Sequence, residues 1–442
     1  MATTYLSKNL PANQNSLHKW TYSGWVKRSE IGNTTHLFNF YDDANNRGGL
    51  RFNSDNTLMY YEHLGGSTVV NKTTNRVFRD VSAWYHVMVA VDKSVSSPDT
   101  QIYINGVEET SFSTDNDYSQ NQTTKINDTD TLYINSEDGS SNIHNQLMAH
   151  VHWVSGYKLT PATFGETDST SGIWKPKTAP SVTYGTNGFF LKFENSAAMG
   201  TDSSGNSNTF TVNGTLTQNT DTPSNNFATL NPLDVSGLAN TGNTFSNGNL
   251  TVTDGSSNYL LTQSSLAVTT GKFYWEVKIN STASDTASGV GIADLDNFSR
   301  ADGGGNTAYG WLYAPDGDKR NSGTSTAYGD TYAANDIIGI ALDMTNGFLY
   351  FSKNGTWQNS GDPTSGASGT GSAYGSISGT IGCHLYDGSS SIAHEFSANF
   401  GQGYFGTTQV ASAGTAPSEG GIFEYDCPSG YQALCTKGIN SF

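Results

Sequence analysis

G-K-F-Y-W-E-V, at Gly271–Val277, opens the stretch of sequence that decides the fold, which continues to Gly401. Apolar and polar side chains alternate from Phe273 to Ile279, and a period of two residues is typical of a strand with one buried face. Ile337–Leu342 is a nearly continuous apolar run, as expected for a central strand. Asn-Gly pairs, which suit tight hairpin turns, lie beside such runs. Strands separated by Gly-rich turns predict a β-sandwich.

Further motifs follow in a fixed order along the same stretch. G-V-G-I-A stands at Gly289–Ala293, Y-G-W-L-Y at Tyr309–Tyr313, L-Y-F-S-K-N-G at Leu349–Gly355 and A-N-F-G at Ala398–Gly401. This series resembles the SPRY domain. Because SPRY domains are binding modules, the resemblance implies a partner rather than a reaction.

The front of the chain carries a different series of strand-like segments. Y-S-G-W-V-K-R-S stands at Tyr22–Ser29, W-Y-H-V-M-V-A-V-D at Trp84–Asp92 and Q-I-Y-I-N-G-V at Gln101–Val107. Their succession resembles the laminin-G-like, concanavalin-type sandwiches. Residues that recur at strand spacing beside turn signals are predicted to form its core: Trp25, Trp84, Val87, Val89, Val91, Ile102 and Ile104.

We therefore predict an all-β fold with two β-sandwich (jelly-roll, concanavalin-like) domains in tandem, and helix in less than about a tenth of the residues. The predicted parts are a laminin-G-like sandwich at 1–166, a connector at 167–235, a SPRY-like sandwich at 236–410 and an extended segment at 411–442. We expect the connector to contribute strands that pack on the first sandwich.

Composition narrows the choice of partners. The 442 residues include 49 Gly and have a formal net charge of −17, which favours solubility and disfavours nucleic acid and anionic membranes. Met1–Trp20 has no apolar core, so no secretion signal is expected, and no run is long enough for membrane insertion. Three cysteines are too few for a disulfide framework. Cys427 and Cys435 could pair across a loop, but reduced thiols are the preferred interpretation.

Four segments of the chain, taken together, have a further resemblance. The laminin-G-like front, S-N-N-F-A-T-L-N-P-L-D at Ser224–Asp234, the SPRY-like part and P-S-G-Y-Q-A-L-C-T at Pro428–Thr436 together are similar to structural proteins of marine tailed bacteriophages. The resemblance implies a virion protein made in the host cytoplasm. Its partners would be other virion proteins and a host cell-surface glycan or protein. A homo-oligomer, with a trimer favoured, is expected.

Catalytic patterns are weak in this sequence. Glycoside hydrolysis needs two carboxylates about 5–10 Å apart, and no such array is evident; Glu276 is expected on a solvated strand face. His150 and His152 have a spacing that suits a metal, but an outward-facing pair is the preferred interpretation. No cofactor is expected. Calcium is the alternative for the oxygen-rich loops at Asp42–Asn46 and Asp202–Asn208.

The strongest binding signal is a run of aromatic and charged residues, since aromatic faces flanked by polar groups suit sugars and peptides. The candidate binding residues are Tyr309, Trp311, Tyr313, Asp316, Asp318 and Arg320. The alternative for Trp311 is a place in the core. No catalytic or metal-binding residues are predicted.

Three functions remain open at this point. The preferred hypothesis is a non-enzymatic tail appendage that binds the host surface. The second is a capsid or tail decoration protein that stabilises the virion, and the third is a surface glycan hydrolase.

Overall fold

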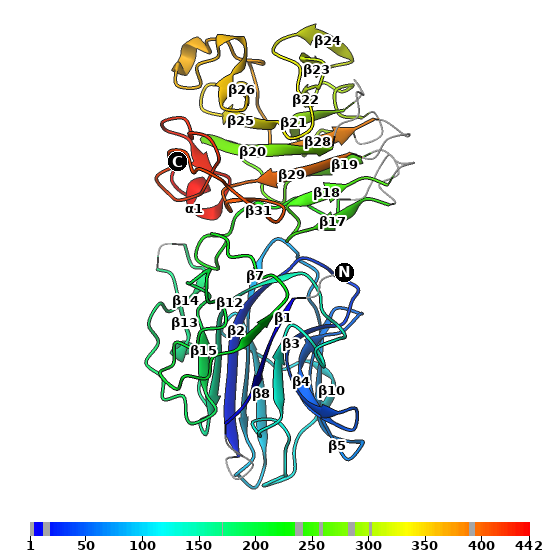
Figure 1. Cartoon of the computed structure of the whole chain (residues 1–442), viewed down its shortest axis with the longest axis vertical. Helices are drawn as coiled ribbons and strands as arrows, with labels where there is room; N and C mark the ends of the chain where they lie inside the picture. The colour runs from blue at the N-terminus through cyan, green and yellow to red at the C-terminus, as the bar shows by residue number, and fades with distance from the viewer. Residues whose placement is uncertain are drawn as a thin grey trace. The chain divides into compact units, whose positions relative to one another are not determined.

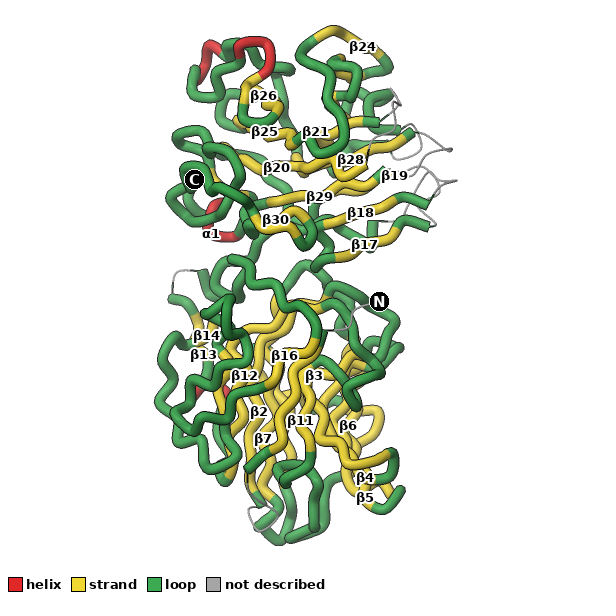
Figure 2. Tube along the Cα trace, in the orientation of Figure 1, coloured by secondary structure: helices red, strands yellow, loops and turns green. Residues whose placement is uncertain are grey.

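The computed structural model describes residues 4–11, 18–169, 171–234, 242–255, 260–281, 288–299, 303–388 and 394–442. Strands make up 44% of the chain and helices 3%, which confirms the predicted all-β fold with two sandwiches in tandem (Figure 2). The chain divides into two compact units, Met1–Gln218 and Asn219–Phe442.

The first unit is a sandwich of two antiparallel sheets (Figure 1). Among the described residues, the larger sheet has the order β10-β6-β5-β4-β3-β11-β1-β16. Its strands are β1 (Tyr5–Asn9), β3 (Thr35–Asp43), β4 (Asn46–Phe52), β5 (Thr57–Leu64), β6 (Ser67–Val77), β10 (Phe112–Asn116), β11 (Thr131–Ile134) and β16 (Thr211–Asn213).

The smaller sheet of the first unit has the order β15-β12-β2-β7-β8-β9 in the described part of the chain. Its strands are β2 (Lys19–Arg28), β7 (Trp84–Asp92), β8 (Asp99–Ile104), β9 (Val107–Glu109), β12 (Gln146–Ser155) and β15 (Phe189–Leu191). A small separate sheet joins β13 (Gly165–Thr167) to β14 (Trp174–Pro176), after the short 3₁₀ turn η1 (Pro161–Thr163).

Both faces of the smaller sheet are covered. The five aliphatic residues predicted for the core lie between the two sheets, in one cluster with Phe38 and Leu50. Trp25 is also buried, but it lies on the opposite face with Phe164, Tyr184 and Phe190, and half-buried Trp84 packs there too. Segment 157–191 therefore adds a second apolar layer to the first unit.

The second unit repeats this architecture with other strands. Its larger sheet, in the described residues, has the order β17-β18-β29-β20-β25-β26-β27, and β32 pairs with β20. The strands are β17 (Thr244–Ser246), β18 (Thr251–Thr253), β20 (Lys272–Ser281), β25 (Ile337–Asp343), β26 (Phe348–Lys353), β27 (Thr356–Trp357), β29 (Glu395–Asn399) and β32 (Gln432–Ala433).

The facing sheet has the order β19-β28-β21-β22-β23-β24. Its strands are β19 (Leu260–Gln263), β21 (Gly289–Asp294), β22 (Gly310–Tyr313), β23 (Asp318–Asn321), β24 (Thr324–Ala327) and β28 (Ile381–Asp387). The core between the sheets includes Trp275, Ile292 and Ile340, so the alternation at Phe273–Ile279 marks a strand with its apolar side in the core. Short elements complete the unit: η2 (Gln358–Ser360), η3 (Gly366–Ser368), β30 (Tyr404–Phe405), β31 (Thr408–Gln409) and α1 (Thr436–Ile439).

The two ends of the second unit are joined by backbone hydrogen bonds. Ala228 N–H donates to Leu434 O at 2.9 Å, and Thr436 N–H donates to Asn226 O at 2.9 Å. The boundary at Gln218/Asn219 thus places residues 219–234 of the predicted connector in the second unit. The rest of the connector packs on the first unit, since β15 pairs with β12 and β16 with β1.

The C-terminal residues, drawn in red in Figure 1, lie beside β20 and β29. Phe423, Tyr431 and Ala433 form a buried cluster with Tyr274 of β20 and Tyr350 of β26. We call residues 411–435 the C-terminal segment. It covers the outer face of the larger sheet in the second unit.

Candidate functional site

The predicted aromatic and charged run folds into a hairpin at the edge of a sheet. β22 pairs with β23 through Leu312 and Arg320, and β23 pairs with β24. All four residues of β24 are exposed. We call residues 309–327 the hairpin surface.

The structure places the predicted binding residues at very different depths. Tyr309 is 43% exposed, and Trp311 is half-buried against the core. Tyr313 is a correction: its ring is 0% exposed and packs on Tyr332 and Phe351, so it cannot contact a partner. The exposed fraction of the side chains on this face therefore falls from Tyr309 to Tyr313.

The charged members of the run hold the hairpin together. The Arg320 guanidinium donates to the Asp316 carboxylate, and Ser325 Oγ donates to Asp318 Oδ2 at 2.6 Å. Asp316 is exposed, while Asp318 and Arg320 are half-buried. These three residues lie close together and remain accessible, unlike Tyr313.

The neighbouring glycine loop is a packed element. A Cβ at Gly304 would lie 2.6 Å from the Tyr386 ring, and one at Gly305 would lie 2.8 Å from Arg320 Cβ. Gly323 N–H donates to Gly305 O at 3.0 Å. Glycine is therefore required for close packing at these positions, which supports the hairpin. Residues 300–302, which precede these glycines, lie outside the described residues.

The prediction that His150 and His152 face outward is also wrong. His152 is only 1% exposed, stacks on Phe190 with ring centroids 3.8 Å apart and lies 2.9 Å from Tyr184 Oη through Nδ1. A bulge separates it from Ala149, and His150 has a φ of 48°. The face that we expected in solvent is covered by the connector, whose apolar environment lowers the pKa of His152.

The two oxygen-rich loops use their oxygens within the protein. Asp43 Oδ1 accepts hydrogen bonds from the backbone of Asn45 and Asn46, and Asp42 pairs with Lys125 at 3.0 Å. The Asp202 carboxylate accepts hydrogen bonds from the backbone N–H groups of Phe190 and Asn208. Among the described residues no group of three or more acidic, His or Cys side chains has a metal-binding arrangement. The loops fit Asx turns, and calcium stays an untested alternative.

All three cysteines are free and buried. The Cys427 thiol donates to Tyr431 O at 3.7 Å, and Cys435 Sγ accepts from Gly438 N–H at 3.3 Å. Cys427 and Cys435 therefore do not pair in this structure. Burial raises the pKa of the Cys427 thiol to about 12, so it is not a reactive thiolate.

Among the fully buried carboxylates, Glu62 in the first unit and Glu276 in the second accept hydrogen bonds from loops. Glu62 accepts hydrogen bonds from Tyr118 Oη and Thr124 Oγ1, both at 2.8 Å, and holds the loop after β10. Glu276 of β20 accepts from the backbone N–H groups of Glu424 and Tyr425, both at 2.9 Å. The expectation that Glu276 is solvated is wrong, because the C-terminal segment covers its face of β20.

Burial changes the ionisation of Glu276. The side chain is 0% exposed and forms no salt bridge with any described residue. Desolvation outweighs the hydrogen bonds from Glu424 and Tyr425 and raises the pKa of Glu276 to about 7. Since the folded-state pKa lies above the unfolded value, the folded unit binds an extra proton between those two values.

We expect the second unit to lose stability as pH rises from about 4.5 to about 7, by roughly 3 kcal/mol from this group. The contribution is fully present below the unfolded pKa and is lost as Glu276 ionises. Chemical denaturation across this pH range, compared with Glu276→Gln, isolates the effect. Parallel pH profiles for the two proteins would contradict it.

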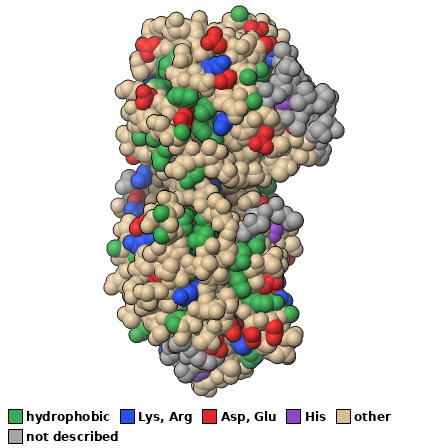
Figure 3. Space-filling view, in the orientation of Figure 1, with side chains coloured by type: hydrophobic (Ala, Val, Ile, Leu, Met, Phe, Trp, Pro, Cys, Tyr) green, Lys and Arg blue, Asp and Glu red, His purple; other side chains and the backbone are tan. Residues whose placement is uncertain are grey.

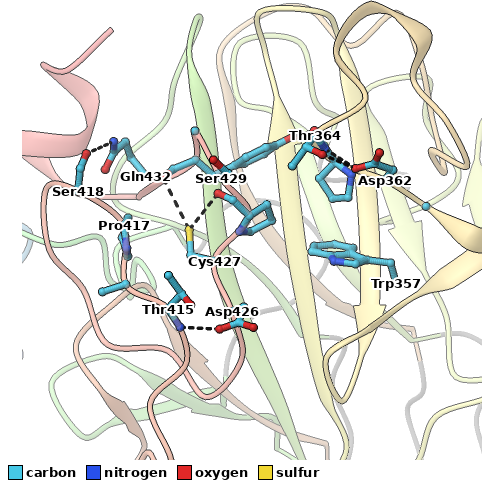
Figure 4. Close-up of a pocket in the computed structure, with 16 residues that line it drawn as sticks. Trp357, Asp362, Thr364, Thr415, Pro417, Ser418, Asp426, Cys427, Ser429 and Gln432 are labelled. Carbon is cyan, nitrogen blue, oxygen red and sulfur yellow. Dashed lines mark hydrogen bonds between the residues drawn. The ribbon is translucent and has the colours of Figure 1, made fainter.

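A pocket in the second unit escaped the sequence analysis. It has a volume of about 650 Å³ and lies between residues 357–364 and the C-terminal segment. Figure 4 shows Trp357 and Asp362 on one side and Thr415, Pro417 and Asp426 on the other. We call it the tail pocket. No local motif marks it, because its walls come from segments about fifty residues or more apart in the sequence.

Trp357 also lines a second hollow. This hollow has a volume of about 440 Å³ and includes Tyr328, Asp330 and Gln358. Ala327, the last residue of β24, also lines this hollow, so Trp357 lies between the tail pocket and a hollow next to the hairpin surface. The second unit thus presents an aromatic side chain between two depressions.

Comparisons with known proteins identify both sandwiches. Residues 3–163 match the model described as the concanavalin A-like lectin/glucanases superfamily, and residues 272–402 match the SPRY domain. A laminin-G-like, concanavalin-type domain and a SPRY domain are therefore present in this chain. Domains of both kinds are typically non-catalytic binding modules.

Individual relatives match a short part of the chain. Ran-binding protein 9 of Xenopus tropicalis is 36% identical over 87 residues, which are 19% of this chain and 16% of that protein. Ran-binding protein 10 of Danio rerio is 36% identical over 87 residues, 19% of this chain and 14% of its own length. The match thus spans about a sixth of these relatives or less.

Solved structures of SPRY domains are also similar to part of the chain. The SPRY domain of human HERC1 is 20% identical with a TM-score of 0.30, and covers 35% of this chain and 91% of its own. The TRIM65 PSpry domain is 16% identical with a TM-score of 0.29. The match covers 39% of this chain and 91% of the TRIM65 domain. As for membranes, the helices in the described ranges are too short or too polar to cross a bilayer.

Proposed function

We propose that this protein is a non-enzymatic phage structural protein, a tail appendage that binds a glycan or protein on the host surface through its SPRY unit. The observation that carries the proposal is the exposed hairpin surface, built on a rigid sandwich of a family that binds partners. The resemblance to virion proteins of tailed phages supports the location. Partners in the virion and a homo-oligomeric, trimeric state belong to the same proposal.

The buried carboxylates support binding over catalysis. Glycoside hydrolysis needs a general acid with a raised pKa in contact with substrate. Glu62 and Glu276 have raised pKa values, but both are fully buried and bound by protein donors. Their role is to hold loops in place, so we infer that neither acts on a substrate.

The surface charge agrees with the proposed partners. On the face drawn in Figure 3, Lys and Arg side chains are few, and several of them lie beside Asp or Glu side chains. The net charge is −17. Because binding to phosphate backbones needs clustered positive charge, a glycan or protein fits better than nucleic acid.

We expect the double variant Asp318→Ala/Arg320→Ala to reduce adsorption of particles to host cells by roughly tenfold, the effect of about 1.4 kcal/mol. Both side chains are accessible and neither is in the core. The measurement is the adsorption rate of purified particles. A matched control removes another surface ion pair, Asp99→Ala/Lys158→Ala in the first unit.

Other outcomes of these experiments would favour one of the two alternative functions. Normal adsorption combined with particles that break under osmotic stress would favour the decoration protein. Hundreds of copies per particle, counted by mass spectrometry, would point the same way, whereas small multiples of three or six fit an appendage. Shortening of host polysaccharide by the purified protein would establish the hydrolase.

A further inference from the structure

The tail pocket combines apolar walls with hydrogen-bonding groups. Its walls include Trp357, Tyr431 and the prolines Pro363, Pro417 and Pro428. Its volume of about 650 Å³ lies within the usual range of small-ligand pockets, which are mostly apolar with a few convergent polar groups. Figure 4 shows Ser429 between the two walls.

The polar groups of the pocket include both donors and acceptors that the protein leaves available. Asp362 uses Oδ1 to accept from Thr364 N–H and Oγ1–H, at 2.9 and 2.6 Å, which leaves its second oxygen for a ligand. The Trp357 indole N–H and the Ser429 hydroxyl donate to none of the described residues. A ligand that fits this set must itself both donate and accept.

The charges that line the pocket exclude a further class of ligand. Asp362 and Asp426 both line the pocket, and none of its described lining residues is Lys, Arg or His. Hydrogen bonds from Thr415 lower the pKa of Asp426, so that carboxylate is ionised at neutral pH. An anionic ligand would be repelled by this pocket.

We propose that the tail pocket is a binding site for a neutral saccharide. The C–H face of a sugar ring packs on an aromatic ring such as Trp357, and sugar hydroxyls both donate to carboxylates and accept from N–H and O–H groups. A lysine or arginine side chain would suit the aspartates but could accept nothing from Trp357 or Ser429.

The pocket is suited to bind a sugar without cleaving it. A hydrolase needs one carboxyl group with a raised pKa to protonate the leaving oxygen. The lowered pKa of Asp426 is the opposite of what a general acid requires. This site is separate from the hairpin surface, so the inference does not depend on where the particle contacts its host.

Saturation-transfer NMR on the full chain tests the proposal. The probes are methyl glucoside, methyl galactoside and maltose as neutral sugars, glucuronic acid as an anion, and glucosamine and tri-lysine as cations. We expect at least one neutral sugar to bind with a Kd of roughly 1 mM and the anion not to bind. Asp362→Asn and Trp357→Ala should each weaken that binding at least tenfold.

The chain offers a closely matched control. Asp55 in the first unit accepts from Thr57 N–H and Oγ1–H at 2.9 and 2.6 Å, as Asp362 does from Thr364. Asp55→Asn should therefore leave sugar binding unchanged. If Trp357→Ala fails to fold, Asp362→Asn and Ser429→Ala decide the result, because neither side chain is in a core cluster.

Three results would overturn the proposal. The first is that no neutral sugar binds, and the second is that both pocket variants bind sugar as the parent does. The third is that glucosamine or tri-lysine binds more tightly than the neutral sugars. Release of reducing ends from maltose would instead contradict the non-enzymatic function while leaving the sugar site in place. Loss of adsorption with normal sugar binding would likewise separate the two proposals.

Discussion

Replacing Glu276 by alanine is expected to destabilise the second unit by about 3–5 kcal/mol and to release the C-terminal segment. The substitution removes the acceptor for two backbone N–H groups, those of Glu424 and Tyr425, and for Tyr274 Oη. Buried donors without an acceptor are costly, so the segment should detach and expose them to water. Calorimetry measures the loss, and limited proteolysis should cut within 411–435.

The same segment supplies the control for this variant. Glu419 is half-buried there, and only its backbone forms the hydrogen bonds seen in the structure. Glu419→Ala should change the free energy of unfolding by less than about 0.5 kcal/mol. A Glu276→Ala protein that melts and resists protease like the parent would show that the carboxylate does not anchor the segment.

The second large effect is expected in the first unit. Val89→Asp should destabilise this unit by about 4 kcal/mol or more, because the side chain is 0% exposed between the two sheets and the new carboxylate would have no partner. Calorimetry of the full chain should then show the transition of the first unit lost or shifted far down.

Val107→Asp is the matched control, since it makes the same change at a side chain that is 68% exposed. It should shift the free energy of unfolding by less than about 0.5 kcal/mol. If Val89→Asp left both thermal transitions in place, the assignment of β7 to the core would be wrong.

Strand periodicity predicted most of the fold and much less of the site. Alternation at Phe273–Ile279 separates two faces of a strand, and it correctly assigned Trp275 to the core. It does not show what covers the other face. Glu276 and His152 were both expected in solvent, and each is covered by a segment distant in the sequence. Burial by long-range packing leaves no local signal in a strand.

The prediction for Tyr313 was wrong for a related reason. Tyr309, Trp311 and Tyr313 follow one another at a period of two, which places them on one face without showing how deep each residue lies. Exposure falls along this face, from 43% at Tyr309 to 0% at Tyr313. The tail pocket was unpredictable because Trp357 and Asp426 meet only after the C-terminal segment has folded back.

The hydrogen bonds that join residues 226–228 to residues 434–436 have a consequence for how the second unit can be rearranged. They bring the entry and exit of its chain side by side, an arrangement that tolerates circular permutation and insertion into a host loop. A short linker across these ends, with new termini opened in an exposed turn, would leave every strand in place. The unit could then be carried as a cassette in a surface loop of another protein.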